Sequence, residues 1–534
     1  MRITIIQMAL FIINLAFFEQ YLLSQPVQCE TNDFVTKNIK TDFGAIGDGI
    51  TNDQPAFEKA AKFFNQRVGC GKLIIPYGLY KVGRQVVDTP RTFMKGYDVL
   101  ALNGASNLTI RGAPNNQGKY PVIKFADGLY YGSFYYNGPK FGLPKCMPIR
   151  DNYDRKAITS IGAAIAIEAC NNISIENLEL DGNLSNLIVG GTYGDVDRQL
   201  YHVGIYTVKG YDIRLKNIHT HHFALDGIEN VGTNNLQLAD IVSEYNGRMG
   251  LAWIGGDSLY AANCKFNRSA NALIGSAPAA GVDIEPENNH DIHFGRFRTC
   301  EFAFNKGCGL VMAAGKWNVQ NMVFEACTFI GYYTWSAWIP GINVHFKDCT
   351  FYGNITRAVS EKEVKNVSEI TSFDGCYFSD VYQKRVCSPV SGYFFDLNSQ
   401  KIRLNNCTIK TYNRGFMWHK SECGPIDSLT SEIENSNIYS ANSKGFHEEV
   451  SGIKIMNSNL FFVEGKSGFG CSNDYYANLK KNSLTIRELV TLVPEFNNPA
   501  PYANNLKEFI CKEERITLKS KKYLKRKPGR KKMR

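Results

Sequence analysis

Residues 323–351, VFEACTFIGYYTWSAWIPGINVHFKDCTF, contain one short pattern twice. A small or polar residue is followed by a cysteine, any residue and a phenylalanine, as in ACTF around Cys327 and DCTF around Cys349. Related segments surround four further cysteines, at Cys264, Cys300, Cys376 and Cys407. The spacings between the six cysteines are 36, 27, 22, 27 and 31 residues. A period of about 20–40 residues with variable insertions predicts a solenoid.

Apolar residues alternate within each copy of the pattern, which is the periodicity of a β-strand. The cysteine and the aromatic residue two positions later therefore lie on the same face of the strand. Because cysteine is small and prefers burial, we expect this face to be the interior, with the six cysteines stacked as reduced thiols. Disulfides between them are the alternative. Four cysteines outside the pattern are better disulfide candidates: Cys387, Cys423, Cys471 and Cys511.

A second column of residues follows the cysteine pattern in most copies. It consists of a glycine and a short apolar–x–apolar segment, at Gly227, Gly250, Gly281, Gly309 and Gly415. Glycine permits a tight bend between strands, and the Asn and Asp residues between the segments favour turns. No segment is long enough for the helical crossovers of a doubly wound α/β fold. The sequence therefore predicts an all-β protein, a parallel β-helix, with an antiparallel sandwich as the alternative.

The two ends of the predicted solenoid differ from its middle. Residues 55–64 form one amphipathic helix, with Asn52 or Asp53 as its N-cap and Pro55 in its first turn. We expect this helix to cover one open end of the solenoid. Residues 484–511 have a partly helical pattern, and they predict a C-terminal cap within residues 476–515. The β-helix domain is predicted to span residues 36–475.

The chain termini carry targeting and charge signals. Residues 1–24 read as a signal peptide, because Arg2 precedes an apolar run to Phe18 and small residues lie near Ser24. A retained membrane anchor is the alternative, and no later segment is predicted to cross a membrane. The net charge of +10 comes largely from the tail 516–534, which holds ten Lys or Arg between Lys519 and Arg534. A solvated, disordered tail and a tail that binds an anionic surface are both open.

A stretch near the N-terminus resembles a known superfamily. Residues 40–64, KTDFGAIGDGITNDQPAFEKAAKFF, and 69–83, GCGKLIIPYGLYKVG, are similar to the N-terminal signature of the pectate-lyase-like superfamily. That superfamily includes rhamnogalacturonase, polygalacturonase and epimerase-like proteins. The matching residues are Asp42, Phe43, Gly44, Ala45, Gly47, Asp48, Gly49, Asn52, Asp53, Ala56, Pro76, Gly78 and Tyr80.

The resemblance implies a right-handed parallel β-helix that handles a polysaccharide. Members of the superfamily include hydrolases, lyases, epimerases and phage tailspikes, so the signature within residues 40–83 implies the fold and not the chemistry. The chain departs from the best-known members. It lacks the ordered NTD, DD, GHG and RIK motifs of polygalacturonases and the YG-x-DPH motif of alginate epimerases. The catalytic residues of those families are therefore not transferred to this sequence.

The segment GVDIEPENNH, residues 281–290, carries the most unusual group of polar residues. Val282 and Ile284 are expected to point inward on a strand, which places Asp283 and Glu285 together on the outer face. Two residues along a strand span roughly 6.5–7 Å. Inverting glycosidases hold their two carboxyl groups about 6.5–9.5 Å apart. We therefore predict Asp283 and Glu285 as a catalytic pair, with a solvated outer face as the alternative.

Neighbouring coils add further candidates to this region. Alignment on the glycine column places Asp226 and Glu229 two coils before Asp283, roughly 10 Å away, with Arg248 on the coil between them. Asp226 and Glu229 form a reserve catalytic pair, although Asp226 could instead serve the turn at Gly227. Candidate substrate-binding residues are Arg248, His222, Glu287 and His290. The run HTHH at residues 219–222 is interpreted as a polar turn, and no metal site is predicted.

Three functions fit these patterns. The leading hypothesis is a secreted, periplasmic or cell-surface glycoside hydrolase that acts on a polysaccharide and needs no cofactor. The second is a polysaccharide lyase or epimerase acting on a uronate polymer, in which the acids would bind Ca²⁺. The third is a non-catalytic glycan-binding surface protein. Nothing in the sequence indicates a nucleic-acid partner, and it does not fix the oligomeric state.

Overall fold

The computed structural model describes residues 34–488 with internal gaps. The residues that it does not describe in this range are 68, 89–91, 135, 138–139, 142–157, 191–198, 288–289, 313–316, 332–333, 354, 357–364, 380–392, 397–400, 412–414, 419–430, 441–452 and 463–484. The predicted signal peptide, the basic tail and the cysteines at 387, 423, 471 and 511 lie outside the described residues. Within the described ranges, no helix has the length and apolar character needed to cross a membrane.

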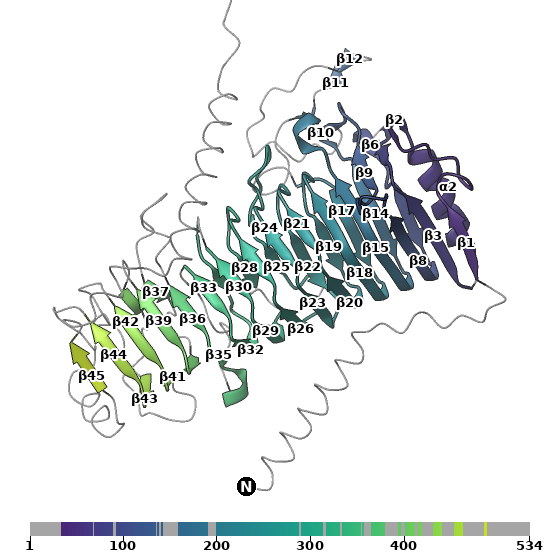
Figure 1. Cartoon of the computed structure of the whole chain (residues 1–534). Helices are drawn as coiled ribbons and strands as arrows, with labels where there is room; N and C mark the ends of the chain where they lie inside the picture. Colours follow the sequence, from purple (N-terminus) through teal and green to yellow (C-terminus); the bar gives the residue numbers. More distant parts are fainter. Residues whose placement is uncertain are drawn as a thin grey trace, which may run out of the picture.

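The described chain coils into a parallel β-helix, seen side-on in Figure 1 with its strands stacked from the N-terminal to the C-terminal end. One wall is an 11-stranded parallel sheet in which each strand comes from a different coil. Its strands, in chain order, are β7 (Leu100–Asn103), β14 (Gly162–Glu168), β17 (His202–Val208), β19 (Ile228–Val231), β22 (Leu251–Gly255), β25 (Val282–Ile284), β28 (Leu310–Met312), β31 (Ala337–Trp338), β34 (Ile355–Thr356), β37 (Tyr393–Asp396) and β40 (Gly415–Trp418).

The remaining walls belong to a 27-stranded sheet that is made of two strand columns. The first column contains β1 (Val35–Asn38), β3 (Gly71–Pro76), β8 (Ser106–Ala113), β15 (Asn171–Asp181), β18 (Tyr211–His221), β20 (Asn234–Ala239), β23 (Leu259–Ala262), β26 (Ile292–Arg298), β29 (Val319–Glu325), β32 (Ile342–Lys347), β35 (Thr371–Asp374), β38 (Ile402–Asn405), β41 (Ser431–Glu434) and β43 (Ile453–Met456).

The second column of this sheet follows a corner in each coil. It contains β2 (Asp48–Asn52), β4 (Leu79–Val82), β9 (Val122–Phe125), β21 (Val242–Glu244), β24 (Lys265–Asn267), β27 (Glu301–Ala303), β30 (Thr328–Ile330), β33 (Thr350–Tyr352), β36 (Tyr377–Ser379), β39 (Thr408–Thr411), β42 (Asn437–Ser440), β44 (Asn459–Phe462) and β45 (Thr485–Glu488). The long strands β15 and β18 pass through the corner and pair with both columns.

Smaller elements decorate the solenoid. A five-stranded sheet consists of β5 (Gln85–Asp88), β6 (Thr92–Gly96), β10 (Tyr130–Ser133), β13 (Ile158–Thr159) and β16 (Ile188–Val189). The strands β11 (Tyr136–Asn137) and β12 (Lys140–Phe141) pair with each other, and two 3₁₀ turns span Leu184–Asn186 and Val367–Glu369.

The corner between the two columns explains the residue that precedes each repeated cysteine. That residue adopts the left-handed conformation. Glycine, which has no Cβ atom, adopts it freely, Asn and Asp tolerate it, and other residues are strained there. The φ values are 55° at Asn263, 53° at Thr299, 50° at Ala326, 54° at Asp348, 65° at Gly375 and 52° at Asn406. A single left-handed residue thus turns the chain from one strand column into the next, and for this reason Asn, Asp or Gly fill four of the six sites.

The predicted interior column of reduced cysteines is confirmed. All six repeated cysteines are free and buried, as are Cys170 and Cys308. Their thiols donate to backbone carbonyls; Cys327 Sγ lies 3.3 Å from Glu325 O and 3.4 Å from Phe297 O. Phenylalanines stack beside them at centroid distances of 4.9 Å from Phe297 to Phe324 and 4.6 Å from Phe302 to Phe329. Burial of this continuous aromatic ladder stabilises the coils. Cys70, outside the ladder, is disulfide-bonded.

The glycine column is confirmed, but glycine is required there for a reason other than a tight bend. None of Gly227, Gly250, Gly281 and Gly309 is among the residues with positive φ. A Cβ atom on Gly227 would lie 2.0 Å from Ser243 Oγ, and one on Gly309 would lie 2.6 Å from Ser336 O. These positions require glycine because neighbouring coils approach too closely for any side chain.

The N-terminal cap is confirmed as helix α2, Gln54–Asn65, which lies at the purple end of the solenoid in Figure 1. Its apolar face, including Phe57 and Phe64, is buried. Asp53 stands at the N-cap position, but its carboxylate accepts the amides of Ile46 at 2.6 Å and Gly47 at 2.9 Å and does not cap the helix. At the other end, the predicted partly helical cap lies outside the described residues except for Thr485–Glu488, which form strand β45.

Candidate functional site

The 11-stranded sheet aligns Glu229 and Asp283 on its outer face. Tyr206 on β17 is opposite Glu229 on β19, followed by Ala252 on β22 and Asp283 on β25. One strand therefore separates the two acids, and their Cα atoms lie roughly 10 Å apart. The placement expected from the glycine column agrees with this register, and the small Ala252 side chain leaves room between the two carboxyl groups.

Arg248 lies between these strands, in the corner that leads into β22. Its side chain is only 13% exposed, and its Nε lies 3.7 Å from Oδ1 of Asp226, whose side chain is fully buried. Neither carboxylate oxygen of Asp226 makes a hydrogen bond of normal geometry with the described residues. The Met249 amide and the Arg248 charge are the neighbouring groups that lower the pKa of the Asp226 carboxyl.

Five acids and one arginine gather at this place, and we call them the carboxyl cluster: Asp226, Glu229, Asp283, Glu285, Glu287 and Arg248. Asp283 is 2% exposed, so the alternative of a solvated outer face does not hold at this position. Among the described residues, several buried polar atoms of the cluster lack a hydrogen-bond partner: both oxygens of Asp226, Oε2 of Glu229, Oδ1 of Asp283 and Nε of Arg248. Buried polar atoms without partners are rare and costly, which makes the cluster a candidate functional site.

Burial changes the protonation of three of these acids. It raises the pKa of Asp226 to about 6, that of Glu229 to about 8 and that of Asp283 to about 8. Repulsion from Asp226 adds to the effect at Glu229, and repulsion from Glu285 adds to it at Asp283. Burial alone would lower the pKa of Arg248, but the surrounding carboxylates raise it. The cluster therefore holds one permanent cation, and Glu229 and Asp283 are the acids whose pKa values lie above neutral pH.

The two remaining acids are more accessible. Glu285 is partly buried and Glu287 is exposed, and their amides continue the strand pairing beyond β25, with Glu285 N donating to Trp253 O at 2.9 Å and Glu287 N to Ile254 O at 3.0 Å. Burial and the charge of Glu285 raise the pKa of Glu287. The backbone thus fixes both residues beside Asp283, and Trp253 is fully buried in the core as the alternation predicts.

Two tyrosines beside the cluster were not predicted. Burial raises the pKa of Tyr201 well above its ordinary value and that of Tyr206 by less, and Glu229 adds to both shifts. Their rings lie 5.3 Å apart in an edge-to-face arrangement. Sequence signals for Tyr206 existed, because Gly204-Ile205-Tyr206 matches the glycine column one coil before Gly227. A phenol and an aromatic face next to acids suit contact with a sugar.

The structure places the four predicted substrate-binding residues in three separate locations. Arg248 and Glu287 belong to the carboxyl cluster. His290 is exposed and follows the undescribed residues 288–289. His222 lies in another group, the histidine cluster, which consists of Glu179, Asp181, His219, His221, His222 and Glu244 on the outer face of the 27-stranded sheet.

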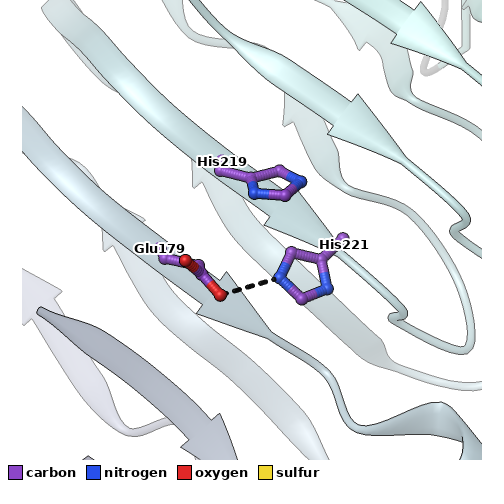
Figure 2. A group of neighbouring side chains, drawn as sticks. All are labelled: Glu179, His219 and His221. Atoms are coloured by element: carbon purple, nitrogen blue, oxygen red, sulfur yellow. Dashed lines mark hydrogen bonds and ion pairs between the residues drawn. The ribbon is translucent and has the colours of Figure 1, made fainter. Parts of the chain in front are cut away.

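The interpretation of HTHH as a polar turn is wrong for its first three residues. His219, Thr220 and His221 belong to strand β18, and only His222 has the left-handed φ of a turn, 57°. Thr220 points inward and is fully buried, so both flanking histidines point outward. Glu179 on β15 pairs in register with His219, and Asp181 with His221. Figure 2 shows Glu179, His219 and His221 converging.

Comparisons with known proteins agree with the fold. No protein-family model matches the chain, and no curated protein matches it in sequence. Similar solved structures include the A-module of a mannuronan C-5 epimerase from Azotobacter vinelandii, at 16% identity over 85% of this chain and 97% of that chain, with a TM-score of 0.42. An endo-xylogalacturonan hydrolase from Aspergillus tubingensis has 14% identity over 85% and 100%, with a TM-score of 0.38.

A surface adhesin of Streptococcus pneumoniae is a third such structure, at 13% identity over 81% of this chain and 91% of that chain, with a TM-score of 0.39. The parallel β-helix that the resemblance of residues 40–83 implies is confirmed by the parallel strand pairing of the structure itself. The three similar proteins are an epimerase, a hydrolase and an adhesin. The function of this chain is therefore argued from its own residues.

Proposed function

We propose that this chain is a secreted glycoside hydrolase that cleaves a polysaccharide at the carboxyl cluster. One observation carries the proposal: Glu229, partly exposed, has a pKa raised to about 8 by burial beside Asp226. A carboxylic acid that keeps its proton at neutral pH and is still reachable from solvent is the group that must protonate a leaving glycosidic oxygen. Asp283 is protonated as well, but its 2% exposure keeps it from contact with a sugar.

Glu285 is the accessible partner for the second half of the reaction. It lies two residues beyond Asp283, and Asp283 is level with Glu229 two strands away. The spacing of strands and residues puts the Cα atoms of Glu229 and Glu285 roughly 12 Å apart. Two glutamate side chains that lean toward each other bring the carboxyl groups within about 6.5–9.5 Å, the separation in inverting enzymes.

The proposed step balances as a single displacement. Glu229 gives its proton to the glycosidic oxygen while the bond from this oxygen to the anomeric carbon breaks. A water molecule forms the new bond to the anomeric carbon from the opposite face, and the Glu285 carboxylate takes the proton of this water. Solvent then returns a proton to Glu229 and removes one from Glu285. The configuration at the anomeric carbon is inverted.

Asp226, Asp283 and Arg248 are assigned positioning roles. Arg248 lies 3.7 Å from Asp226 and is held among the acids, so its charge limits how far their pKa values rise. Asp283 is deeply buried beside Glu285, and burial and repulsion from Glu285 raise the pKa of Asp283. With one cation among five acids, the cluster favours a neutral glycan over a polyuronate, which would need a bridging cation such as Ca²⁺.

A substrate panel tests the proposal. The purified chain is incubated with neutral glycans, pectins, alginates and sulfated galactans, with and without Ca²⁺, and both reducing ends and the ultraviolet absorbance of unsaturated uronates are followed. The proposal expects new reducing ends without that absorbance and without a need for Ca²⁺. Absorbance that rises together with reducing ends identifies a lyase, and binding without any cleavage identifies a glycan-binding protein. Either of these two results overturns the hydrolase proposal.

Matched variants then locate the reaction. Glu229→Gln and Glu285→Gln replace the proposed acid and base, and Glu176→Gln is the control. Glu176 is an acid on the outer face of the 27-stranded sheet that pairs with Arg111 at 3.3 Å. Activity that survives in both cluster variants contradicts the assignment of the carboxyl cluster as the site.

A further inference from the structure

The histidine cluster has a different chemistry from the carboxyl cluster and is independent of it. Three residues, Glu179, His219 and His221, each offer a ligand atom, and these atoms lie within 4.8 Å of one another. They come from neighbouring coils, because β15 and β18 pair in parallel register. Imidazole nitrogen together with carboxylate oxygen is a donor set that suits Zn²⁺ and related transition metals.

The distances already approach those of a metal site. His221 Nε2 lies 3.3 Å from Glu179 Oε1, as the dashed line in Figure 2 marks. Two ligands of a tetrahedral Zn²⁺ ion with metal–ligand distances of about 2.0–2.1 Å lie roughly 3.3 Å apart. The His219 and His221 rings are tilted by 41° with centroids 4.3 Å apart, and the ligand atoms of both lie within 4.8 Å of that of Glu179.

Other partners leave this triad as the best ligand set in the cluster. Asp181 already forms an ion pair with Lys124 at 2.9 Å, and Glu244 forms one with Arg268 at 3.0 Å. Glu179, by contrast, contacts His221. His219 Nε2 lies 3.3 Å from Oε1 of Glu244, the acid that also pairs with Arg268.

His222 orients the central ligand. Its Nδ1 lies 2.6 Å from Nδ1 of His221, so one of these two nitrogens carries a hydrogen and the other accepts it. His222 is itself held by stacking on Tyr245, with ring centroids 5.4 Å apart and planes 4° from parallel. When His221 donates through Nδ1, its Nε2 lone pair faces the Glu179 carboxylate. A cation between them removes this repulsion.

We propose that Glu179, His219 and His221 bind one Zn²⁺ ion, with a fourth position open to water. The ion joins two adjacent coils of the β-helix on a wall that the proposed glycan reaction does not use. The open fourth position distinguishes the site from a closed structural zinc site.

Metal titration of the untagged full-length chain tests this proposal. After treatment with a chelator, Zn²⁺ is titrated by calorimetry, and Co²⁺ is added separately as a spectroscopic substitute. We expect one Zn²⁺ per chain, a visible Co²⁺ absorption typical of four-coordinate nitrogen and oxygen ligands, and no comparable binding of Mg²⁺. His219→Asn and Glu179→Gln should each weaken Zn²⁺ binding at least tenfold and remove the Co²⁺ spectrum.

A matched control and a folding check complete the experiment. His293→Ala removes a histidine that also contacts a carboxylate, Asp257 at 3.2 Å, and should leave Zn²⁺ binding unchanged. Circular dichroism and thermal unfolding show whether each variant is folded; His219 is 38% exposed, so its substitution is tolerated structurally. The proposal is overturned if the wild-type chain binds no Zn²⁺, or if folded His219→Asn and Glu179→Gln variants bind it as tightly as the wild type.

Discussion

Both polar clusters of this β-helix contain buried or half-buried acids, but the pKa values of these acids are shifted in opposite directions. In the carboxyl cluster, burial raises the pKa values of Glu229 and Asp283 to about 8. In the histidine cluster, hydrogen bonds from His221 and His219 lower the pKa values of Glu179 and Glu244. The same fold presents both clusters on outer faces of its strands, so the difference comes from the partners of each acid.

Pairing explains this contrast. Each acid of the histidine cluster lies beside an imidazole, and Asp181 and Glu244 also contact Lys124 and Arg268. The acids of the carboxyl cluster share Arg248 as their cation. Groups that are buried without enough partners destabilise the folded state, and proteins retain them where chemistry requires it. The carboxyl cluster is therefore interpreted as the reactive site, and the histidine cluster as the place for a bound cation.

The largest expected effect is on catalysis. Glu229→Gln removes the proposed proton donor and should lower kcat by about 10²–10⁴-fold, since general acid catalysis contributes this much. Reducing-end release on the substrate identified by the panel measures the effect. Glu176→Gln should keep kcat within about twofold of the wild type. Equal activity in Glu229→Gln and wild type would move the proton donor elsewhere.

The next effect is on stability. Arg248→Met leaves the acids without their cation and should lower the free energy of unfolding by about 3 kcal/mol. The loss should be larger at pH 8 than at pH 5, because the acids are charged at the higher pH. Urea unfolding at both pH values measures it. An equal loss at both pH values would show that Arg248 stabilises through packing alone.

A smaller effect should come from metal removal at the other cluster. Saturating Zn²⁺ should raise the free energy of unfolding by about 2–3 kcal/mol at a concentration near 100 times the Kd. Thermal unfolding with Zn²⁺ and with a chelator measures this difference. Glu229→Gln should show the same difference as the wild type. A changed Zn²⁺ effect in this variant would mean that the two clusters are coupled.

A last effect concerns the pH dependence of stability. The pKa of Asp283 is higher in the folded state, about 8, than its ordinary value of 3.8, so its contribution to stability is complete at low pH and is lost as the pH rises to about 8. Asp283→Asn removes this loss and should flatten the stability profile between pH 5 and pH 8. An unchanged slope would contradict the raised pKa.

Much of the fold was predictable because its signals repeat. The alternation in ACTF and DCTF fixes the inward face, and the small residue before each cysteine marks the corner that the positive φ values confirm. The helix over residues 55–64 follows from its apolar face. The role of Asp53 was not predictable from spacing, because its carboxylate binds the amides of Ile46 and Gly47, which precede it in a folded turn.

The sequence predicted which residues of the candidate site align on neighbouring strands, but it did not predict how deeply they are buried. The glycine column places Glu229 and Asp283 one strand apart, as the structure has them. The 2% exposure of Asp283 arises only in the assembled solenoid, and no local sequence pattern encodes it. The histidine cluster was missed because Glu179 and His219 are neighbours only after β15 and β18 are aligned across one coil.

The most direct test of this account is infrared spectroscopy of the carboxyl groups at neutral pH. Difference spectra between pH 7 and pH 9 are recorded for the wild type, Glu229→Gln, Asp283→Asn and the control Glu176→Gln. The account predicts a carbonyl band of protonated carboxylic acid at pH 7 that disappears toward pH 9, is weaker in each cluster variant and is unchanged in the control. A wild-type spectrum without this band at pH 7 would contradict a proton-holding carboxyl cluster, and with it the proposed proton donor.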